Sequence, residues 1–425
     1  MKKLLYTFIF LFAAIFLPIG WAGTKVSSLT FTDEASAASG HGKEVKKAIL
    51  AARDQIKSGK DLDKAEKSMM SLLNDSDNLD NDKIWSTLFD ALQGQYKAGN
   101  EALYLKQKYD TAAFFQITSR LFTQMERYDS IDALPDKKGR VELKMRKDNA
   151  ELLHRIRPNL YNGGLYYLSR QKYAEGYTLL QQYIDAARQP LFEAYQYEEK
   201  DQRMPMAAYW SVYAAYKQKN VKNVLHNTYL ALKDTTHTEM MLQYLSDTYR
   251  IDGDTMRYVQ TLQDGFAHYP LSPFFFSHLV EYYSSQQEWT KALELTDKAL
   301  SADSTNILFR LTKSTMLLNT GDYQQAYDIS KELLEKNDSL ADAILNAGLA
   351  QFNLGVTSSK QYRKDATARK QVLSCYRTAL PYLERYRTMQ PDRQDKWALP
   401  LYTIYLNLNM GEKFDEIDKL IKAGK

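Results

Sequence analysis

Six histidines and a single cysteine are the side chains best suited to metal binding or nucleophilic chemistry in this chain of 425 residues. The histidines are scattered, with no His-x-x-x-His pair. Cys375 has no catalytic partner that can be placed beside it, so we expect a small buried apolar residue. No nucleophile elbow, glycine-rich phosphate loop or Ser-x-x-Lys set stands in a plausible setting. The sequence therefore predicts no catalytic residues, no metal and no cofactor.

One acidic run, residues 74–83, has the composition of a calcium loop. Such a loop needs glycine at its sixth position and a bidentate glutamate at its twelfth. Counted from Asp75, those positions hold Asp80 and Ser86, so the run is expected to be an exposed connection between helices.

Small residues, aromatics and turn signals recur every 34 residues in the second half of the chain. Trp289 and Tyr323 are 34 apart, and so are Ala292 and Ala326. Units that begin at Pro205, Glu239, Pro273, Ile307 and Ala341 follow the same step. A period of this length is typical of a helix–turn–helix solenoid, in which each unit buries its apolar face by stacking on its neighbours.

Small or short side chains are expected where the two helices of a unit approach each other. The eighth position of each unit holds Val212, Ser246, Val280, Ser314 or Gly348. The twentieth position holds Val224, Tyr258, Ala292 or Ala326. Gly163 and Gly164 are explained by close helix packing in an earlier unit.

This pattern resembles the tetratricopeptide repeat, most closely in Thr320 to Leu333 and in Gln287 to Leu300. The resemblance implies an all-α, right-handed α-solenoid of about eight or nine antiparallel helix pairs that acts by binding a protein or peptide. It departs at Tyr258 and Val224, which are bulky where alanine is usual.

The resemblance also implies a concave groove lined by the first helix of each unit. Projecting its positions onto this chain gives an aromatic surface with one cation: Tyr161, Tyr209, Trp210, Tyr213, Tyr216, Tyr244 and Arg250. Aromatic side chains with a polar tip suit a recognition surface. Three alternatives stay open: the rings pack only within the solenoid, they bind a glycan or another small ligand, or distant repeats assemble an enzyme site. A carboxylate clamp is not supported, because its positions carry Tyr, Leu, Ser and Asp.

Residues 1–22 have the pattern of a secretory signal, with Lys2 and Lys3, an apolar run from Leu4 to Phe16, and small residues Gly20 and Ala22 around a cleavage site. We therefore expect export to the periplasm or cell envelope. An uncleaved membrane anchor is the alternative. Without the two lysines, 56 basic residues become 54 against 52 acidic ones, a net charge of +2. That balance gives no electrostatic argument for nucleic acid or an anionic membrane as partner.

The expected layout follows from these features. A flexible linker spans 23–42, irregular helical repeats span 43–140, and the regular solenoid spans 141–392. The solenoid period is interrupted by insertions at 191–204 and 356–374, the second of which is expected to lengthen two helices. A closing helix pair spans 393–425, and residues 128–140 are expected to be a loop.

Overall fold

The computed structural model describes residues 31–136, 138–359 and 366–423, and every regular element in these ranges is a helix. Contacts divide the chain into two units: unit 1 spans 1–109 and 130–142, and unit 2 spans 110–129 and 143–425. The predicted leader, residues 1–22, lies outside the described residues.

Unit 1 is built from three helices around a small apolar core. Its helices are α1 (Phe31–Ser58), α2 (Leu62–Leu72) and α3 (Asp82–Tyr104), and α1 packs on both of the others. Trp85 is fully buried and donates from Nε1 to the carbonyl of Leu79, 2.8 Å away. The acidic run 74–83 is largely an exposed connection between α2 and α3, as predicted, but it includes a 3-10 turn (Ser76–Asn78) whose Asn78 is buried, and α3 takes up its last two residues. Asn81 caps α3 by accepting from the backbone N–H of Lys83.

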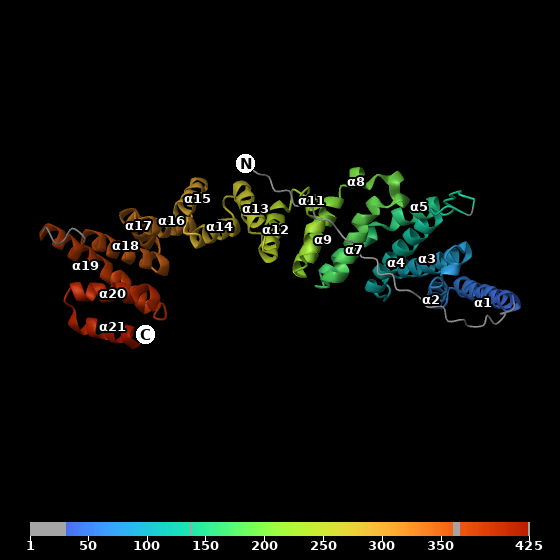
Figure 1. The fold of residues 1–425 in the computed structure, drawn as a ribbon, viewed down its shortest axis with the longest axis horizontal. Coiled ribbons are helices and arrows are strands. Elements are labelled where there is room, and N and C mark those ends of the chain that lie inside the picture. Colours follow the sequence, from blue (N-terminus) through green and yellow to red (C-terminus); the bar gives the residue numbers. More distant parts are fainter. Residues whose placement is uncertain (1–30, 137, 360–365, 424–425) are drawn as a thin grey trace, which may run out of the picture. The chain divides into compact units, whose positions relative to one another are not determined.

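Unit 2 is a solenoid of helix pairs, which confirms the predicted all-α, tetratricopeptide-like architecture. Apart from the short α8, which is bypassed by a contact between α7 and α9, consecutive helices pack on each other from α6 to α21. Figure 1 shows their order along the chain. The helices of unit 2, in chain order, are α4 (Thr111–Asp132, whose last residues belong to unit 1), α5 (Arg146–Ile156), α6 (Pro158–Leu168), α7 (Tyr173–Asp185), α8 (Tyr197–Lys200), α9 (Met204–Lys217), α10 (Val221–His226), α11 (Thr228–Ala231), α12 (Thr238–Asp252), α13 (Thr255–His268), α14 (Pro273–Ser285), α15 (Trp289–Ala302), α16 (Ile307–Thr320), α17 (Tyr323–Lys336), α18 (Ala341–Ser359), α19 (Ala366–Met389), α20 (Gln394–Asn407) and α21 (Gly411–Ala423).

The 34-residue period is visible in the backbone as well as in the sequence. The turn between the two helices of a pair contains a residue with left-handed φ, and four such residues are 34 apart: Lys219, Gly253, Gln287 and Gly321. Glycine adopts this conformation without strain, which explains two of the four. In the preceding helix pair, the corresponding turn residue is Gln171, 48 residues before Lys219, so the period is lengthened by the 14 residues of the predicted insertion at 191–204.

The positions predicted to hold small side chains are sites of close helix approach. Ser314, Ala292 and Ala326 are fully buried, and the Ser314 hydroxyl lies 2.6 Å from that of Ser330 on the second helix. A β-carbon on Gly164 would lie 2.5 Å from the side chain of Leu180. The interpretation of Gly163 and Gly164 as packing residues is therefore confirmed.

Three segments differ from the sequence-based layout. Helix α1 begins at Phe31, so the prediction of a flexible linker through residue 42 is wrong from that point. Helix α4 continues to Asp132, which shortens the loop predicted for 128–140, because Met125 and Tyr128 are buried on its inner face. Most of α4 also belongs with unit 2, although the predicted boundary lay at residue 140.

In the described residues, the carboxyl-terminal end consists of two long helices and a final helix pair. Helix α18 runs into the second insertion from one side and α19 begins within it, so both helices are long. Helices α20 and α21 pack on each other as a pair. A β-carbon on Gly355 would lie 2.6 Å from the ring of Tyr376, so the extended helices stay tightly packed.

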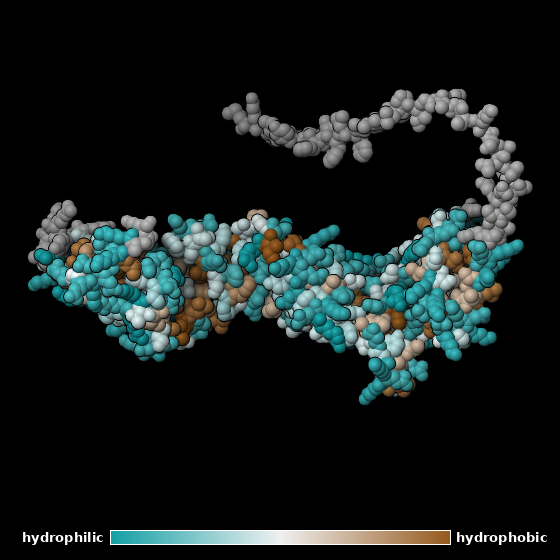
Figure 2. Space-filling model, turned by 90° about the horizontal axis from the view of Figure 1, so that it is seen from below, coloured by the Kyte–Doolittle hydropathy of each residue, from teal (hydrophilic) through white to brown (hydrophobic). Residues whose placement is uncertain are grey.

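The hydrophobic side chains on the surface do not form one continuous area. Figure 2 shows a largely hydrophilic face with hydrophobic side chains in separate patches. Within the described ranges, no helix combines the length and the apolar character needed to span a bilayer.

Candidate functional site

Helix α9 carries an aromatic stripe that unit 2 holds in place from both sides. Tyr209, Tyr213 and Tyr216 are spaced by four and three residues and therefore lie on one face of the helix, with Trp210 beside them. The opposite face consists of small buried residues, including Ala208 and Ala215, which let α9 pack closely on α7, α10 and α11.

Helix α12 completes the stripe with Tyr244. The ring centroid of Tyr244 lies 4.4 Å from that of Tyr216, 6.0 Å from that of Tyr213 and 6.3 Å from that of Tyr209. His237, directly before the same helix, stacks on Tyr209 with ring centroids 4.0 Å apart, and its Nδ1 lies 2.7 Å from a carboxylate oxygen of Asp234. Burial raises the pKa of Tyr244, so its phenol stays neutral.

The structure brings all seven residues of the sequence-based site into one connected group. Tyr161 lies beside Trp210, which packs edge-on against Tyr213. At the other end, the Tyr216 hydroxyl donates to Asp247 at 2.8 Å, and Asp247 pairs with Arg250 at 2.9 Å. Burial, with the bond to Asp247, raises the pKa of Tyr216 to about 12.

The members of this group differ in exposure, and this divides them into two roles. Tyr161, Tyr209 and Tyr244 are 9%, 5% and 7% exposed, so their rings are largely unavailable to a ligand. Three other rings are half-buried and Arg250 is exposed, which leaves a partly open surface: Trp210, Tyr213, Tyr216 and Arg250. Packing within the solenoid thus explains the three buried rings. That the four more open residues bind a ligand stays a prediction.

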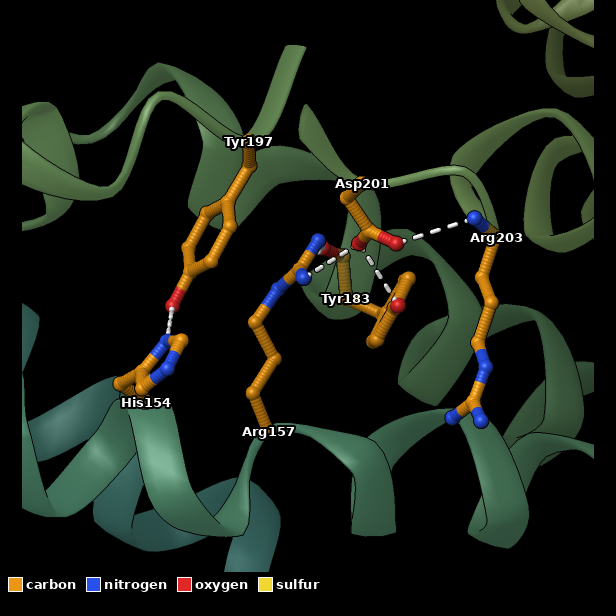
Figure 3. A network of polar contacts seen from close by, with 6 residues as sticks. All are labelled: His154, Arg157, Tyr183, Tyr197, Asp201 and Arg203. Carbon is orange, nitrogen blue, oxygen red and sulfur yellow. Dashed lines mark hydrogen bonds and ion pairs between the residues drawn. The ribbon is translucent and has the colours of Figure 1, made fainter. Parts of the chain in front are cut away.

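A second constellation, absent from the sequence-based predictions, surrounds Arg157 at the junction of α5 and α6 (Figure 3). Arg157 is only 4% exposed, and its guanidinium lies between the rings of Tyr183 and Tyr197, 3.7 and 3.8 Å from their centroids. It donates to the carbonyl of Tyr183 at 2.8 Å and pairs with Asp201 at 2.5 Å. Such a caged guanidinium is a rigid structural centre.

Asp201 is held as a carboxylate by this cage. It accepts hydrogen bonds from the Tyr183 hydroxyl at 2.7 Å and from the backbone N–H of Arg203 at 3.0 Å. Burial alone would raise its pKa, but the bonds from Tyr183 and Arg157 outweigh burial, and the pKa of Asp201 is lowered.

His154 closes one side of the constellation. Its Nδ1 lies 2.8 Å from the Tyr197 hydroxyl, and its ring stacks on Tyr195 at 4.0 Å. Burial and the charge of Arg157 lower the pKa of His154, so it is neutral at pH 7.

These side chains line an open cleft of about 730 Å³, which we call the Arg157 cleft. Besides the residues above, its lining includes Arg155, Lys200 and Arg203. The insertion at 191–204 supplies Tyr195, Tyr197 and the residues that follow. The break in the 34-residue period was the one sequence signal for this cleft, because no motif links Arg157 to an aspartate 44 residues later.

A third titratable group lies between α4 and α7. Burial, and then the charges of Asp185 and Asp129, raise the pKa of Glu126 to about 7. Asp129 itself is paired with Arg146 at 2.7 Å. A carboxyl group whose folded pKa exceeds the unfolded value of 4.5 binds more protons in the folded state, so stability falls as the pH rises between these two values.

Glu126→Gln is therefore expected to stabilise the protein at pH 8 by about 1–2 kcal/mol, since the amide removes a partly buried charge. The gain should disappear near pH 4, where the wild-type carboxyl is already protonated in both states. Urea denaturation of both proteins across this pH range measures the difference. A gain that is equal at pH 4 and pH 8 would contradict the electrostatic cause.

Comparisons with known proteins add a resemblance of fold. No family model matches the chain, and no curated protein has a significant match. The chain is similar to the C-terminal part of a TPR repeat-containing protein from Cytophaga hutchinsonii, at 13% identity and a TM-score of 0.41, over 62% of this chain and 94% of that one. It is also similar to a tetratricopeptide repeat protein from Parabacteroides merdae, at 14% identity and a TM-score of 0.35, over 63% and 98%. A third similar structure is PilW, a type IV pilus biogenesis factor, at 14% identity and a TM-score of 0.34, over 52% of this chain and 94% of that one. At these scores nothing that the three proteins do is transferred to this chain.

Proposed function

We propose that this tetratricopeptide-like repeat protein is an exported interaction scaffold that binds a partner protein, through an extended segment, on the aromatic stripe of α9 and α12. The observation that supports the proposal is that half-buried aromatic rings contact buried aromatic rings, which fix their positions. Trp210, Tyr213 and Tyr216 are accessible, while Tyr209 and Tyr244 hold them from below.

Pre-ordered aromatic rings favour binding for a physical reason. A side chain that is already fixed by its neighbours loses little conformational entropy when a ligand covers it. Trp and Tyr also add a hydrogen-bonding tip to a large apolar contact area. A small patch of three such rings can therefore act as the energetic centre of an interface.

Removing the two most central open rings is expected to weaken partner binding strongly. In Trp210→Ala/Tyr213→Ala, we expect the affinity for the partner to fall by about 30-fold or more, which corresponds to at least about 2 kcal/mol. The measurement is quantitative affinity capture from a cell-envelope fraction, followed by binding titration of the captured protein. The matched control is Tyr229→Ala, which removes a 79% exposed ring on α11.

Two outcomes would overturn the proposal. Partner binding that survives the double substitution, with the helical fold intact by circular dichroism, removes the stripe as the interface. Unchanged capture together with lost oligosaccharide binding on a glycan array assigns the same rings to a glycan.

Export rests on residues 1–22, whose charged start, apolar run and small residues around position 21 have the pattern of a signal peptide. Mass spectrometry of the native protein's amino terminus is expected to begin at or near residue 23. An intact amino terminus in the membrane fraction would instead favour the uncleaved anchor.

A further inference from the structure

The Arg157 cleft carries positive charge that its own residues do not balance. Arg155, Lys200 and Arg203 line it and are exposed, and among the described residues none of their side chains forms a hydrogen bond or an ion pair. Asp201 is the one carboxylate in the lining, and Arg157 already neutralises it at 2.5 Å. Three uncompensated cations therefore face the open cleft.

The acidic residues of the insertion do not cancel this charge. Glu193, Glu198 and Glu199 are exposed on the same segment but are absent from the lining of the cleft. Glu198 is directed to another cation, Arg188, at 3.6 Å. The caged Arg157 in turn keeps the loop that carries Lys200 and Arg203 in one conformation, through Asp201 and the backbone N–H of Arg203.

We propose that the Arg157 cleft binds acidic side chains of an extended peptide segment, in the same partner that covers the aromatic stripe. This inference rests on the proposed function and adds the charge of the ligand and a second contact point. The chemistry is carboxylate recognition by arginine and lysine next to aromatic rings. A cleft of about 730 Å³ is in the range that holds a ligand of many atoms and is larger than one inorganic anion needs.

The cleft and the aromatic stripe are close enough for one segment to reach both. Arg203 directly precedes α9, and Trp210 follows it by seven residues, or two helical turns, on the same side of the helix. Seven residues correspond to about 10 Å along the axis. An extended peptide covers that distance with about three residues. Tyr161 also lies between the two sites, because it is near Trp210 and its ring centroid is 5.8 Å from that of Tyr183 in the cleft.

The test uses the full chain and two labelled probes of equal length, hexaglutamate and hexaglutamine, in fluorescence polarisation titrations at low salt. We expect hexaglutamate to bind more tightly than hexaglutamine, with an affinity that falls as salt is added. In Arg155→Gln/Lys200→Gln/Arg203→Gln, hexaglutamate binding is expected to weaken roughly tenfold or more, as three exposed ion pairs would give. The control with the same loss of charge is Lys298→Gln/Lys331→Gln/Lys336→Gln, at exposed sites on α15 and α17.

Each other outcome overturns the inference. Equal binding of the two probes removes carboxylate recognition, and equal weakening by both triple variants shows that net charge alone attracts the probe. Inorganic phosphate that binds as tightly as hexaglutamate assigns the cleft to a free anion. The proposed function fails separately, when Trp210→Ala/Tyr213→Ala leaves partner capture intact, whatever hexaglutamate does.

Discussion

Arg157→Met is expected to lower the free energy of unfolding by about 3–5 kcal/mol, the usual loss when one partner of a buried ion pair is removed. Asp201 would keep its charge in a largely buried position, where its side chain is 14% exposed. The carbonyl of Tyr183 would lose both of the guanidinium N–H groups that it now accepts. Methionine fills much of the space between the two tyrosine rings, so the loss is electrostatic rather than a cavity effect. Urea denaturation gives the magnitude.

The pH dependence of this loss identifies its cause. In the wild type, the pKa of Asp201 is below its ordinary value of 3.8, so its stabilising contribution is present above pH 3.8 and is lost as the pH falls through the lowered pKa. In Arg157→Met the burial of Asp201 is no longer offset, and its pKa should rise instead. The difference between the two proteins must therefore shrink as the pH falls from 7 toward 3.

Two further variants separate the ion pair from general effects of losing a cation. Arg155→Met removes an exposed arginine of the same cleft and is expected to change stability by no more than about 0.5 kcal/mol. Asp201→Asn in the Arg157→Met background removes the stranded charge and should recover part of the loss. A loss below about 1 kcal/mol in Arg157→Met alone would show that the cage does not hold the insertion in place.

The repeat period was sufficient to place the helices of the regular solenoid. The five predicted unit starts all lie within one residue of an observed helix start, at Met204, Thr238, Pro273, Ile307 and Ala341. This accuracy has a physical basis, because each unit must present the same small residues to its neighbours to stack. Outside the regular repeats, no sequence period indicates where a helix begins or ends. The helical start of α1 within the expected linker is an example.

The candidate sites were predictable to different degrees for the same reason. The seven residues of the aromatic group were found because repeat positions share a face of the solenoid, and contacts within unit 2 connect them. Their burial was not predictable, since it depends on how Tyr244 packs onto Tyr209 and Tyr216 from the next unit. The Arg157 cleft depends on pairings across 26 and 44 residues that involve the insertion, and no local pattern encodes such pairings.

Gly265 is a packing constraint that no sequence pattern indicated, and we expect the second large effect from substituting it. Gly265→Ala should lower the free energy of unfolding by about 2–3 kcal/mol, although alanine favours a helix over glycine by about 1 kcal/mol. The added β-carbon would lie 2.4, 2.5 and 2.6 Å from three ring atoms of Phe275. That ring is fully buried and has Tyr269 and Phe274 as aromatic neighbours, so it cannot turn away.

Gly411→Ala is the matched control, because a β-carbon there meets no atom within 4 Å and the residue begins α21. We expect it to leave stability unchanged or slightly raised. Phe275→Leu in the Gly265→Ala background replaces the ring by a smaller side chain and should restore part of the lost stability, whereas Phe275→Leu alone should destabilise. Such a reversal of sign between backgrounds would demonstrate that α13 and α14 are held at this distance by the absence of a side chain at Gly265. If Gly265→Ala instead stabilises the protein, helix propensity outweighs the contact, and the close approach of these two helices does not limit the solenoid.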